Sequence, residues 1–235
     1  MRQAPLPPLC LLAGGRGVRL GSLTDDVPKP LVEVADRPFL DWVLVQVKEA
    51  GFERVVLCVG YKGSAIRSHV GDGGQFGLEV TYSDDGPQLV GTLGAVRQAL
   101  PLLGDPVPVL YADTLLPIDL ASVVRGHSPA DARMTMTVLH NSGRWDTSNA
   151  VVGERRVIAY SKAPPPPGAE WIDYGFCVIN RDVLAASHDS DLASVTSALA
   201  KENGVAAWPV TEPFHEIGTP QSLAATERWV RSTLR

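Results

Sequence analysis

Short apolar runs alternate with helical segments through the first half of the chain, and this alternation is what most restricts the fold. The apolar runs have the composition of buried strands and lie at residues 9–12, 54–59, 78–82 and 107–111. Segments with helical spacing or helix-end signals separate them, at residues 38–50, 63–70 and 94–103. This rhythm predicts an α/β fold, a Rossmann-like, mostly parallel twisted sheet with helices on both faces.

After residue 131 the pattern becomes richer in strands. Apolar runs follow one another with turn-rich segments between them, at residues 134–139, 150–152, 157–160, 171–179 and 205–210. Two helices are expected near the end of the chain, at residues 192–201 and 221–234. We therefore expect a single domain over residues 1–235 with two halves, about 9–130 and about 131–235.

Charge and cysteine content exclude several classes of protein. The formal net charge of −5 argues against a nucleic-acid partner or an anionic membrane, because both need a basic surface. The three cysteines are widely separated, which indicates neither a disulfide framework nor a zinc site. The chain has no apolar leader and no run long enough to span a bilayer, so we expect a cytoplasmic protein.

A glycine-rich stretch directly follows the first predicted strand. Residues 14–20 read GGRGVRL, which places three glycines and two arginines there. Glycines let backbone amides approach phosphate oxygens, and a guanidinium adds charge-assisted hydrogen bonds. The stretch is not a P-loop, because no Gly-Lys-Ser/Thr ends it, and it lacks the third glycine of a dinucleotide fingerprint. It fits a triphosphate, although a glycine turn after a strand is structural about as often.

A lysine between two prolines is the second unusual feature. Pro28 and Pro30 restrict the backbone on both sides of Lys29, so its ammonium group is held on a stiff segment. Solvated surface lysines rarely need such a backbone. The rigid lysine therefore strengthens the prediction of a phosphate site.

Together, GGRGVRL, Thr24 and PKPL resemble the signature of the sugar-1-phosphate nucleotidyltransferase family, with Val18 where the family commonly has threonine. The resemblance runs from about Leu9 to the C-terminal helix. It implies that Arg19 and Lys29 are catalytic, the first stabilising the leaving pyrophosphate and the second the reacting phosphates. The implied nucleotide-binding residues are Leu12, Ala13, Gly14, Gly15, Gly17, Arg19, Gly91, Thr92 and Gly94. The last three belong to a Gly-Thr-x-Gly-Ala segment that is equally a helix N-terminus capped by Thr92.

The same resemblance implies a metal site and a sugar-phosphate site. Asp113 ends a buried strand at the position where the family holds Mg²⁺, and Glu216 stands where many members have a second metal-binding aspartate. Glutamate can ligate magnesium, although its longer side chain leaves room for an intervening water. Lys162 resembles the lysine that meets the sugar phosphate, but Ser161 replaces its usual acidic neighbour. The implied sugar-phosphate-binding residues are Asp113, Asn149, Lys162, Asp173, Tyr174 and Gly175.

The implied activity is transfer of a nucleoside monophosphate from a nucleoside triphosphate to a sugar 1-phosphate, with release of pyrophosphate. The first half would bind the nucleotide and the second half the sugar. The segments 89–95, 147–149, 172–175 and 216–218 most resemble the heptose 1-phosphate guanylyltransferase branch. That branch implies GTP and D-glycero-D-manno-heptose 1-phosphate, used for capsule, lipopolysaccharide or other glycan precursors. The alternatives are a uridylyl- or thymidylyltransferase acting on a hexose or amino-sugar 1-phosphate, and a non-catalytic nucleotide-sugar binding relative.

Other polar residues receive no functional assignment from the sequence. The five histidines have no spacing that indicates a metal or a proton relay. The Ser83-Asp84-Asp85-Gly86 segment is interpreted as a turn before a helix. Apolar positions left over on the helices are compatible with a homodimer.

Overall fold

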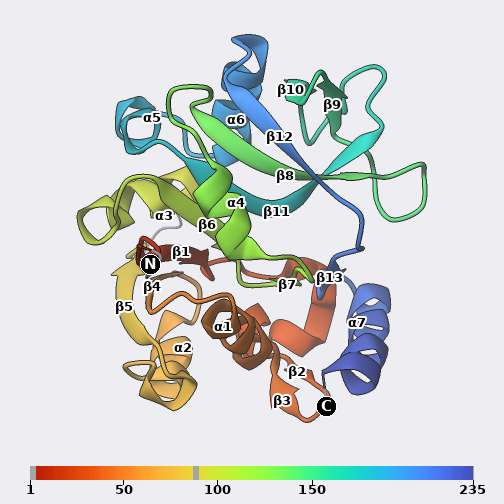
Figure 1. The fold of residues 1–235 in the computed structure, drawn as a ribbon. Coiled ribbons are helices and arrows are strands. Elements are labelled where there is room, and N and C mark those ends of the chain that lie inside the picture. Colours follow the sequence, from red (N-terminus) through yellow and green to blue (C-terminus); the bar gives the residue numbers. More distant parts are fainter. Residues whose placement is uncertain (1–3, 87–89, 235) are drawn as a thin grey trace.

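A nine-stranded mixed sheet forms the centre of the computed structural model, which describes residues 4–86 and 90–234 (Figure 1). Its strand order is β5-β4-β1-β6-β11-β8-β12-β10-β9. The strands of the first half are mutually parallel, namely β1 (Leu9–Leu12), β4 (Arg54–Val59), β5 (Glu79–Asp84) and β6 (Val107–Tyr111). The predicted alternation of strands and helices in this half is confirmed.

The second half extends the same sheet with mixed pairing. Its strands are β8 (Met134–His140), β9 (Ala150–Gly153), β10 (Arg156–Tyr160), β11 (Trp171–Ile179) and β12 (Val205–Val210). Strand β11 runs antiparallel to both β6 and β8, whereas β8 and β12 are parallel. Because β11 pairs with a strand of each half, the two halves share one continuous sheet.

Helices cover both faces of the sheet, as predicted. One face packs against α1 (Phe39–Glu49), α2 (Gly63–Val70), α4 (Leu120–Gly126) and α7 (Pro220–Thr233). The other packs against α3 (Gly91–Ala99), α5 (Arg181–Ala186) and α6 (Leu192–Lys201). Neighbouring residues of β1 point to opposite faces, with Leu11 in one core cluster and Cys10 in the other.

Several short elements were not predicted. They include the bridges β2 (Glu33–Val34), β3 (Arg37–Pro38), β7 (Thr114–Leu115) and β13 (His215–Glu216), helices α4 and α5, and the 3₁₀ turns η1 (Val18–Thr24), η2 (Lys29–Leu31), η3 (Gly74–Phe76) and η4 (Leu100–Leu102). A two-residue bridge has no hydrophobic period of its own, so its existence depends on its partner. The pairing of β13 with β7 joins segments about a hundred residues apart in sequence.

Helix α3 begins earlier than predicted, at Gly91 rather than residue 94. Its N-cap is Val90, and the described residues give that cap no side-chain hydrogen bond. Thr92 therefore lies inside the first turn, and its interpretation as the cap of this helix was wrong. None of the helices within residues 4–86 and 90–234 is long and apolar enough to cross a membrane.

The order of the strands determines where a ligand can bind. Strands β1 and β6 are neighbours, and from them the chain proceeds outward in opposite directions, through β4 and β5 on one side and β11 on the other. In open α/β sheets, such a reversal leaves a crevice beyond the carboxyl ends of the two strands. The glycine-rich stretch follows β1 at that edge, and Asp113 follows β6.

Candidate active site

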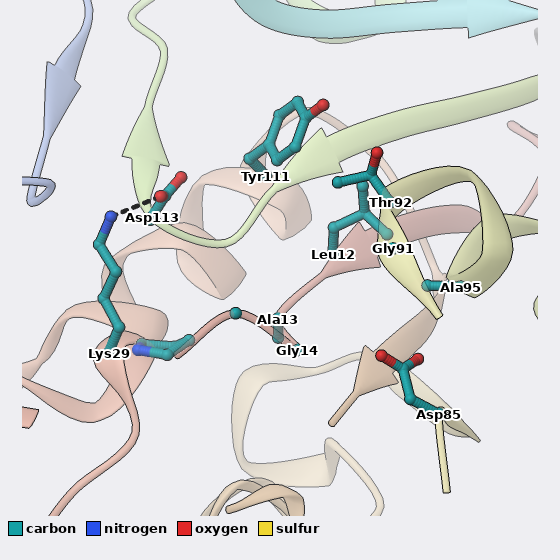
Figure 2. A pocket seen from close by; sticks show the side chains of 12 residues that line it. Leu12, Ala13, Gly14, Lys29, Asp85, Gly91, Thr92, Ala95, Tyr111 and Asp113 are labelled. Carbon is teal, nitrogen blue, oxygen red and sulfur yellow. Dashed lines mark hydrogen bonds and ion pairs between the residues drawn. The ribbon is translucent and has the colours of Figure 1, made fainter. Parts of the chain in front are cut away.

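A cavity of about 190 Å³ lies at the carboxyl ends of β1 and β6 (Figure 2). Its wall is formed by residues from the glycine-rich stretch, η2, the end of β5, the first turns of α3 and the end of β6, namely Leu12, Ala13, Gly14, Gly15, Lys29, Pro30, Asp85, Gly91, Thr92, Ala95, Tyr111 and Asp113. Eight of these are predicted site residues. Pro30, Asp85, Ala95 and Tyr111 were not predicted.

The glycine-rich stretch is fixed beside β4 by backbone hydrogen bonds. The Ala13 amide donates to the Cys58 carbonyl at 2.9 Å, and the Tyr61 amide donates to the Gly14 carbonyl at 3.2 Å. A Cβ on Gly14 would lie 3.2 Å from both the Gly60 nitrogen and a carboxylate oxygen of Asp85. Glycine therefore keeps the backbone close to the cavity without a side chain in the way.

Lys29 and Asp113 form an ion pair at one side of the cavity, with 2.6 Å between Nζ and Oδ2 (Figure 2). Lys29 begins the 3₁₀ turn η2 and is only 8% exposed. Asp113 follows β6, and Thr114 donates to its other oxygen at 3.1 Å. A buried ammonium group is costly unless it is paired, so the carboxylate holds Lys29 in place. The pair places one cation and one anion in the cavity that the glycine-rich stretch also lines.

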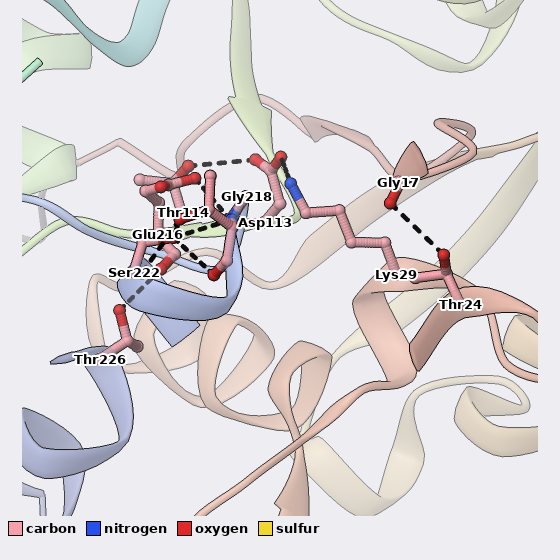
Figure 3. A network of polar contacts seen from close by, with 10 residues as sticks. Gly17, Thr24, Lys29, Asp113, Thr114, Glu216, Gly218, Ser222 and Thr226 are labelled. Carbon is pink, nitrogen blue, oxygen red and sulfur yellow. Dashed lines mark hydrogen bonds and ion pairs between the residues drawn. The ribbon is translucent and has the colours of Figure 1, made fainter. Parts of the chain in front are cut away.

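Glu216 lies on the neighbouring bridge, in register with Thr114 (Figure 3). Its Oε2 accepts a hydrogen bond from the Gly218 amide at 2.6 Å, so the carboxylate turns back on its own segment. The Ile217 amide donates to the Asp113 carbonyl at 3.1 Å, which holds the two segments together. Arg19 is exposed and lies beside Gly218, since a Cβ added to that glycine would be 3.1 Å from Nη2 of the arginine. Asp113, Glu216 and Arg19 thus converge on one edge of the sheet.

The carboxylate donors are suited to a hard cation. Among the described residues, no group of three or more histidine, cysteine, aspartate and glutamate side chains could hold a metal ion. Magnesium usually binds one or two protein carboxylates and completes its coordination with water and phosphate oxygens. Asp113, whose side chain is 34% exposed, and Glu216 fit that donor set.

A second group of polar side chains surrounds Asp173 on β11. The Tyr160 hydroxyl donates to its Oδ2 at 2.9 Å, and the Gly175 amide donates to its Oδ1 at 3.0 Å. The register of β11 against β8 shifts between Asp173 and Cys177, and Gly175 has φ of 98° there. A bulge of this kind re-aims neighbouring side chains. Burial first, and then the charge of Asp173, raise the pKa of Tyr160 well above its usual range.

Tyr111 connects this group with the main cavity. It contributes both to the main cavity and to a smaller hollow that is also lined by Asp173 and Gly175. The Lys162 ammonium lies 5.6 Å from the centre of its ring. Burial, with the nearby carboxylate of Asp173, raises the pKa of Tyr111, so the ring keeps a neutral hydroxyl. Lys162 and Asp173 are thereby brought together beside the main cavity.

Two predicted sugar-phosphate residues are placed differently. Tyr174 points to the opposite face of β11, where it is 1% exposed and packs edge-on against Phe214 at 5.8 Å. Asn149 accepts a hydrogen bond from the Asp173 amide at 2.8 Å, so its side-chain oxygen supports β11. Among the predicted nucleotide-binding residues, Gly94 is buried in α3. Leu89 begins the segment 89–95 that resembles the heptose 1-phosphate branch, and it lies outside the described residues.

Asp85 is the functional candidate that the sequence interpretation missed. It follows β5 and lines the main cavity (Figure 2). Asp84 belongs to the strand and pairs with Arg67 at 3.3 Å. Burial first, and then the charge of Asp84, raise the pKa of Asp85 above its ordinary value. A signal was present, because Asp85 follows a parallel strand just as Asp113 does, and the carboxyl ends of such strands meet at one side of a sheet.

Comparison with known proteins identifies the chain's relatives. The nucleotidyl transferase family model matches residues 9–225. An N-acetylmuramate alpha-1-phosphate uridylyltransferase of Neisseria meningitidis is 41% identical over 113 residues, which are 48% of this chain and 49% of that protein. A D-glycero-alpha-D-manno-heptose 1-phosphate guanylyltransferase of Campylobacter jejuni is 36% identical over 114 residues, 48% of this chain and 50% of that protein. The chain thus matches about half the length of these curated relatives.

A solved structure supports the fold over almost the whole chain. HddC of Yersinia pseudotuberculosis, complexed with GMP-PN, superposes with a TM-score of 0.78 at 21% identity, covering 95% of this chain and 99% of that one. Likeness at this identity concerns the fold alone. It agrees with the predicted sheet and its helical layers.

We predict that the backbone of Gly17 and the position of Lys29 depend on each other. Gly17 has φ of 65° and ψ of 28°, and a Cβ there would lie 2.8 Å from the Cβ of Lys29. Gly77 has nearly the same conformation, with φ of 67° and ψ of 24°, but its Cβ would meet only the mobile end of Lys48. Both alanine variants lose about 1–2 kcal/mol through the left-handed backbone.

Gly17→Ala should therefore cost roughly 1–3 kcal/mol more than Gly77→Ala, because only the first overpacks a buried side chain. Urea unfolding followed by circular dichroism measures the difference. Equal losses in the two variants would contradict the proposed contact.

Proposed function

The chain belongs to the nucleotidyl transferase family, and we propose that it transfers GMP from GTP to a sugar 1-phosphate, releasing pyrophosphate. The preferred acceptor in this proposal is D-glycero-D-manno-heptose 1-phosphate. The observation that carries it is the Lys29–Asp113 pair, which puts a fixed cation and a carboxylate beside an open glycine-rich backbone. We assign nucleotide binding to residues of about 9–130 and sugar binding to about 131–235.

The phosphate end of the nucleotide is assigned to the Lys29 side of the cavity. The amide of Gly15 can approach phosphate oxygens there, and Lys29 supplies positive charge from a rigid segment. Arg19, exposed on the same edge, can reach the departing pyrophosphate. In this reaction an oxygen of the sugar phosphate attacks the α-phosphorus in line with that leaving group. The attacking oxygen is already ionised at neutral pH, so positioning and charge stabilisation are the protein's main tasks.

Asp113, with support from Glu216, is the proposed holder of Mg²⁺. A bound magnesium ion would neutralise phosphate charge in the transition state. Lys29 donates to one oxygen of Asp113 and the Thr114 hydroxyl donates to the other, whereas the Gly218 amide donates to one oxygen of Glu216. An ionised carboxylate has about four lone-pair sites, so both side chains keep acceptor capacity for other partners. This arrangement supports a site in which phosphate oxygens complete the coordination.

The sugar phosphate is assigned to the side of the cavity beyond Tyr111. Lys162 provides a positive charge there, and Asp173 provides a carboxylate whose orientation is fixed by Tyr160 and Gly175. A cation suits the phosphate, whereas an oriented carboxylate suits sugar hydroxyls. Asn149 and Tyr174 are assigned supporting roles, because one braces the Asp173 backbone and the other packs in the core.

The choice of guanine is supported by Asp85. The cavity carries opposite charges at separate places, with Lys29 near Asp113 and the carboxylate of Asp85 beside Gly14. Lys29 and the proposed Mg²⁺ would offset the carboxylate of Asp113, whereas Asp85 forms no ion pair within residues 4–86 and 90–234. A triphosphate is repelled by a carboxylate without such compensation, so the base is assigned to the side of Asp85. Guanine offers two adjacent donors, N1–H and the N2 amino group, which a carboxylate can accept together. Uracil and thymine offer only one N–H, and it lies between two carbonyl oxygens. The negative charge of a carboxylate repels those oxygens.

A uridylyltransferase is the second candidate, because the relative with 41% identity carries that name. A matrix of GTP, UTP, dTTP and ATP against heptose, mannose, glucose and N-acetylmuramate 1-phosphates tests the choice through pyrophosphate release. We expect the highest turnover with GTP and the heptose phosphate, and loss of turnover when EDTA removes magnesium. Turnover with UTP alone would favour the second candidate, and no release with any pair would indicate a non-catalytic relative.

We predict that Lys29→Ala and Arg19→Ala each lower kcat about a hundredfold, the usual effect of removing a preorganised contact to transition-state charge. Stopped-flow or coupled measurement of pyrophosphate release gives the rates. Arg67→Ala is the matched control, because Arg67 pairs with Asp84 outside the cavity. Circular dichroism must first verify that each variant is folded. Unchanged rates in folded Lys29 and Arg19 variants would refute the roles assigned here.

We predict that Asp85→Asn lowers kcat/KM for GTP by about 30-fold, because an amide cannot accept from both guanine donors and hydrogen bonds to charged groups are the stronger ones. Use of UTP should fall less or rise. Asp84→Asn removes the same charge one residue earlier but outside the cavity, so it should leave the preference for GTP unchanged. An equal effect of the two substitutions, or none at position 85, would argue against guanine recognition by Asp85.

A further inference from the structure

The segment that precedes α6 is bonded along the side of α3. The Arg97 guanidinium donates to the Ser187 carbonyl at 2.6 Å. At the start of α3, the amides of Leu93 and Gly94 donate to the Ser190 carbonyl at 3.0 and 3.5 Å. The Leu93 amide would otherwise lack a partner within its own helix, because it belongs to the first turn. A carbonyl from the second half of the chain therefore caps a helix of the first half.

A side-chain pair completes this attachment. The Thr92 hydroxyl donates to Asp191 Oδ1 at 2.9 Å and accepts from the Leu192 amide at 2.9 Å. Asp191 is itself the N-cap of α6, and the same Oδ1 accepts from the Ala193 amide at 3.0 Å. Thr92 and Asp191 thus cap the start of α6 together. With its donor and one acceptor position in use, the Thr92 hydroxyl is held by α6.

Close packing at Gly91 strengthens the connection. Gly91 has φ of 78°, and a Cβ there would collide with the Ser190 carbonyl. The chain therefore approaches Ser190 more closely than any other residue type would allow. Gly91, Thr92 and Ala95 also line the main cavity. The same residues therefore form part of the cavity wall and contact the segment that starts α6.

Asp191 also lies close enough to Lys162 for their charges to interact. Burial raises the pKa of Asp191, but the Ala193 amide, the Thr92 hydroxyl and the Lys162 charge outweigh it, so the net shift is downward. Asp191 therefore has two possible influences on the site. One acts through its hydrogen bond to Thr92, and the other through its charge on Lys162.

We propose that Asp191 is a positioning residue for the nucleotide: through Thr92 it fixes the first turn of α3, and with it one wall of the cavity, against the second half of the chain. The effect on catalysis rests on the proposed transferase function. The geometry favours the hydrogen bond over the charge, because Oδ1 joins Thr92 and Ala193 in one cap. Asparagine retains that oxygen and loses only the charge.

Substrate kinetics separate the two influences. Asp191→Ala should raise KM for the nucleoside triphosphate about fivefold, the scale of one lost hydrogen bond, and leave KM for the sugar phosphate within about twofold. Asp191→Asn should restore the nucleotide KM. Thr92→Val should match Asp191→Ala, and the double variant should be no worse than the poorer single one, because both remove the same bond. If Asn behaves like Ala, or if the sugar-phosphate KM changes instead, the positioning role is wrong.

Asp119→Ala controls for the loss of an ordinary helix cap. Asp119 caps α4 by accepting from the Ser122 amide at 3.0 Å, and it does not line the cavity. Its removal should lower thermal stability about as much as Asp191→Ala does, with unchanged KM values. A change in nucleotide KM in this control would assign the effect of Asp191→Ala to general destabilisation.

Amide hydrogen exchange tests the attachment without any activity. In the substrate-free protein, Asp191→Ala should speed exchange at Leu93 and Gly94 about fivefold, whereas Asp119→Ala should leave it unchanged. Unaltered exchange in Asp191→Ala would overturn the proposal. If the wild-type chain releases no pyrophosphate but exchange responds as expected, the transferase function has failed and the attachment stands.

Discussion

The ion pair between Lys29 and Asp113 is the interaction on which the site depends. It joins a rigid turn after the glycine-rich stretch to the end of β6. A buried ammonium group without its carboxylate would be strongly destabilising, so each partner requires the other. The pair also marks the end of the cavity to which the phosphates are assigned, because Lys29 and a Mg²⁺ ion held by Asp113 would both attract them. Everything assigned to the reacting phosphates follows from this placement.

The carboxylate of Asp85 gives the cavity its second distinguishing feature. It lies beside the backbone of Gly14 and faces the same space as Lys29, but from a different strand end. A ligand that is anionic at one end and rich in hydrogen-bond donors at the other satisfies both groups. Guanosine triphosphate has that character. The choice of GTP therefore rests on charge placement, because the relatives include both a guanylyltransferase and a uridylyltransferase.

The two halves of the chain are joined at two levels. Strand β11 makes the sheet continuous, and the segment around Ser190 and Asp191 bonds the start of α3 to α6. The first connection positions Asp173 beside Tyr111, and the second positions the wall that contains Thr92. A reaction between two substrates requires both to be held in register. In the proposed positioning role, the hydrogen bond from Thr92 to Asp191 holds the nucleotide side of the cavity in place for this reaction.

The sequence alone determined the order and type of the long elements, because their hydrophobic periods and glycine or proline boundaries are local properties. It also drew attention to Lys29 through its flanking prolines and to Asp113 through its position at a strand end, although the metal-binding role of Asp113 came from the family resemblance and stays a prediction. Tertiary structure alone decided which side chains meet. In the folded chain Tyr174 packs in the core, Asp85 lines the cavity, and the Thr92 hydroxyl donates to Asp191. These outcomes depend on strand bulges and on contacts between distant segments, which no local pattern encodes.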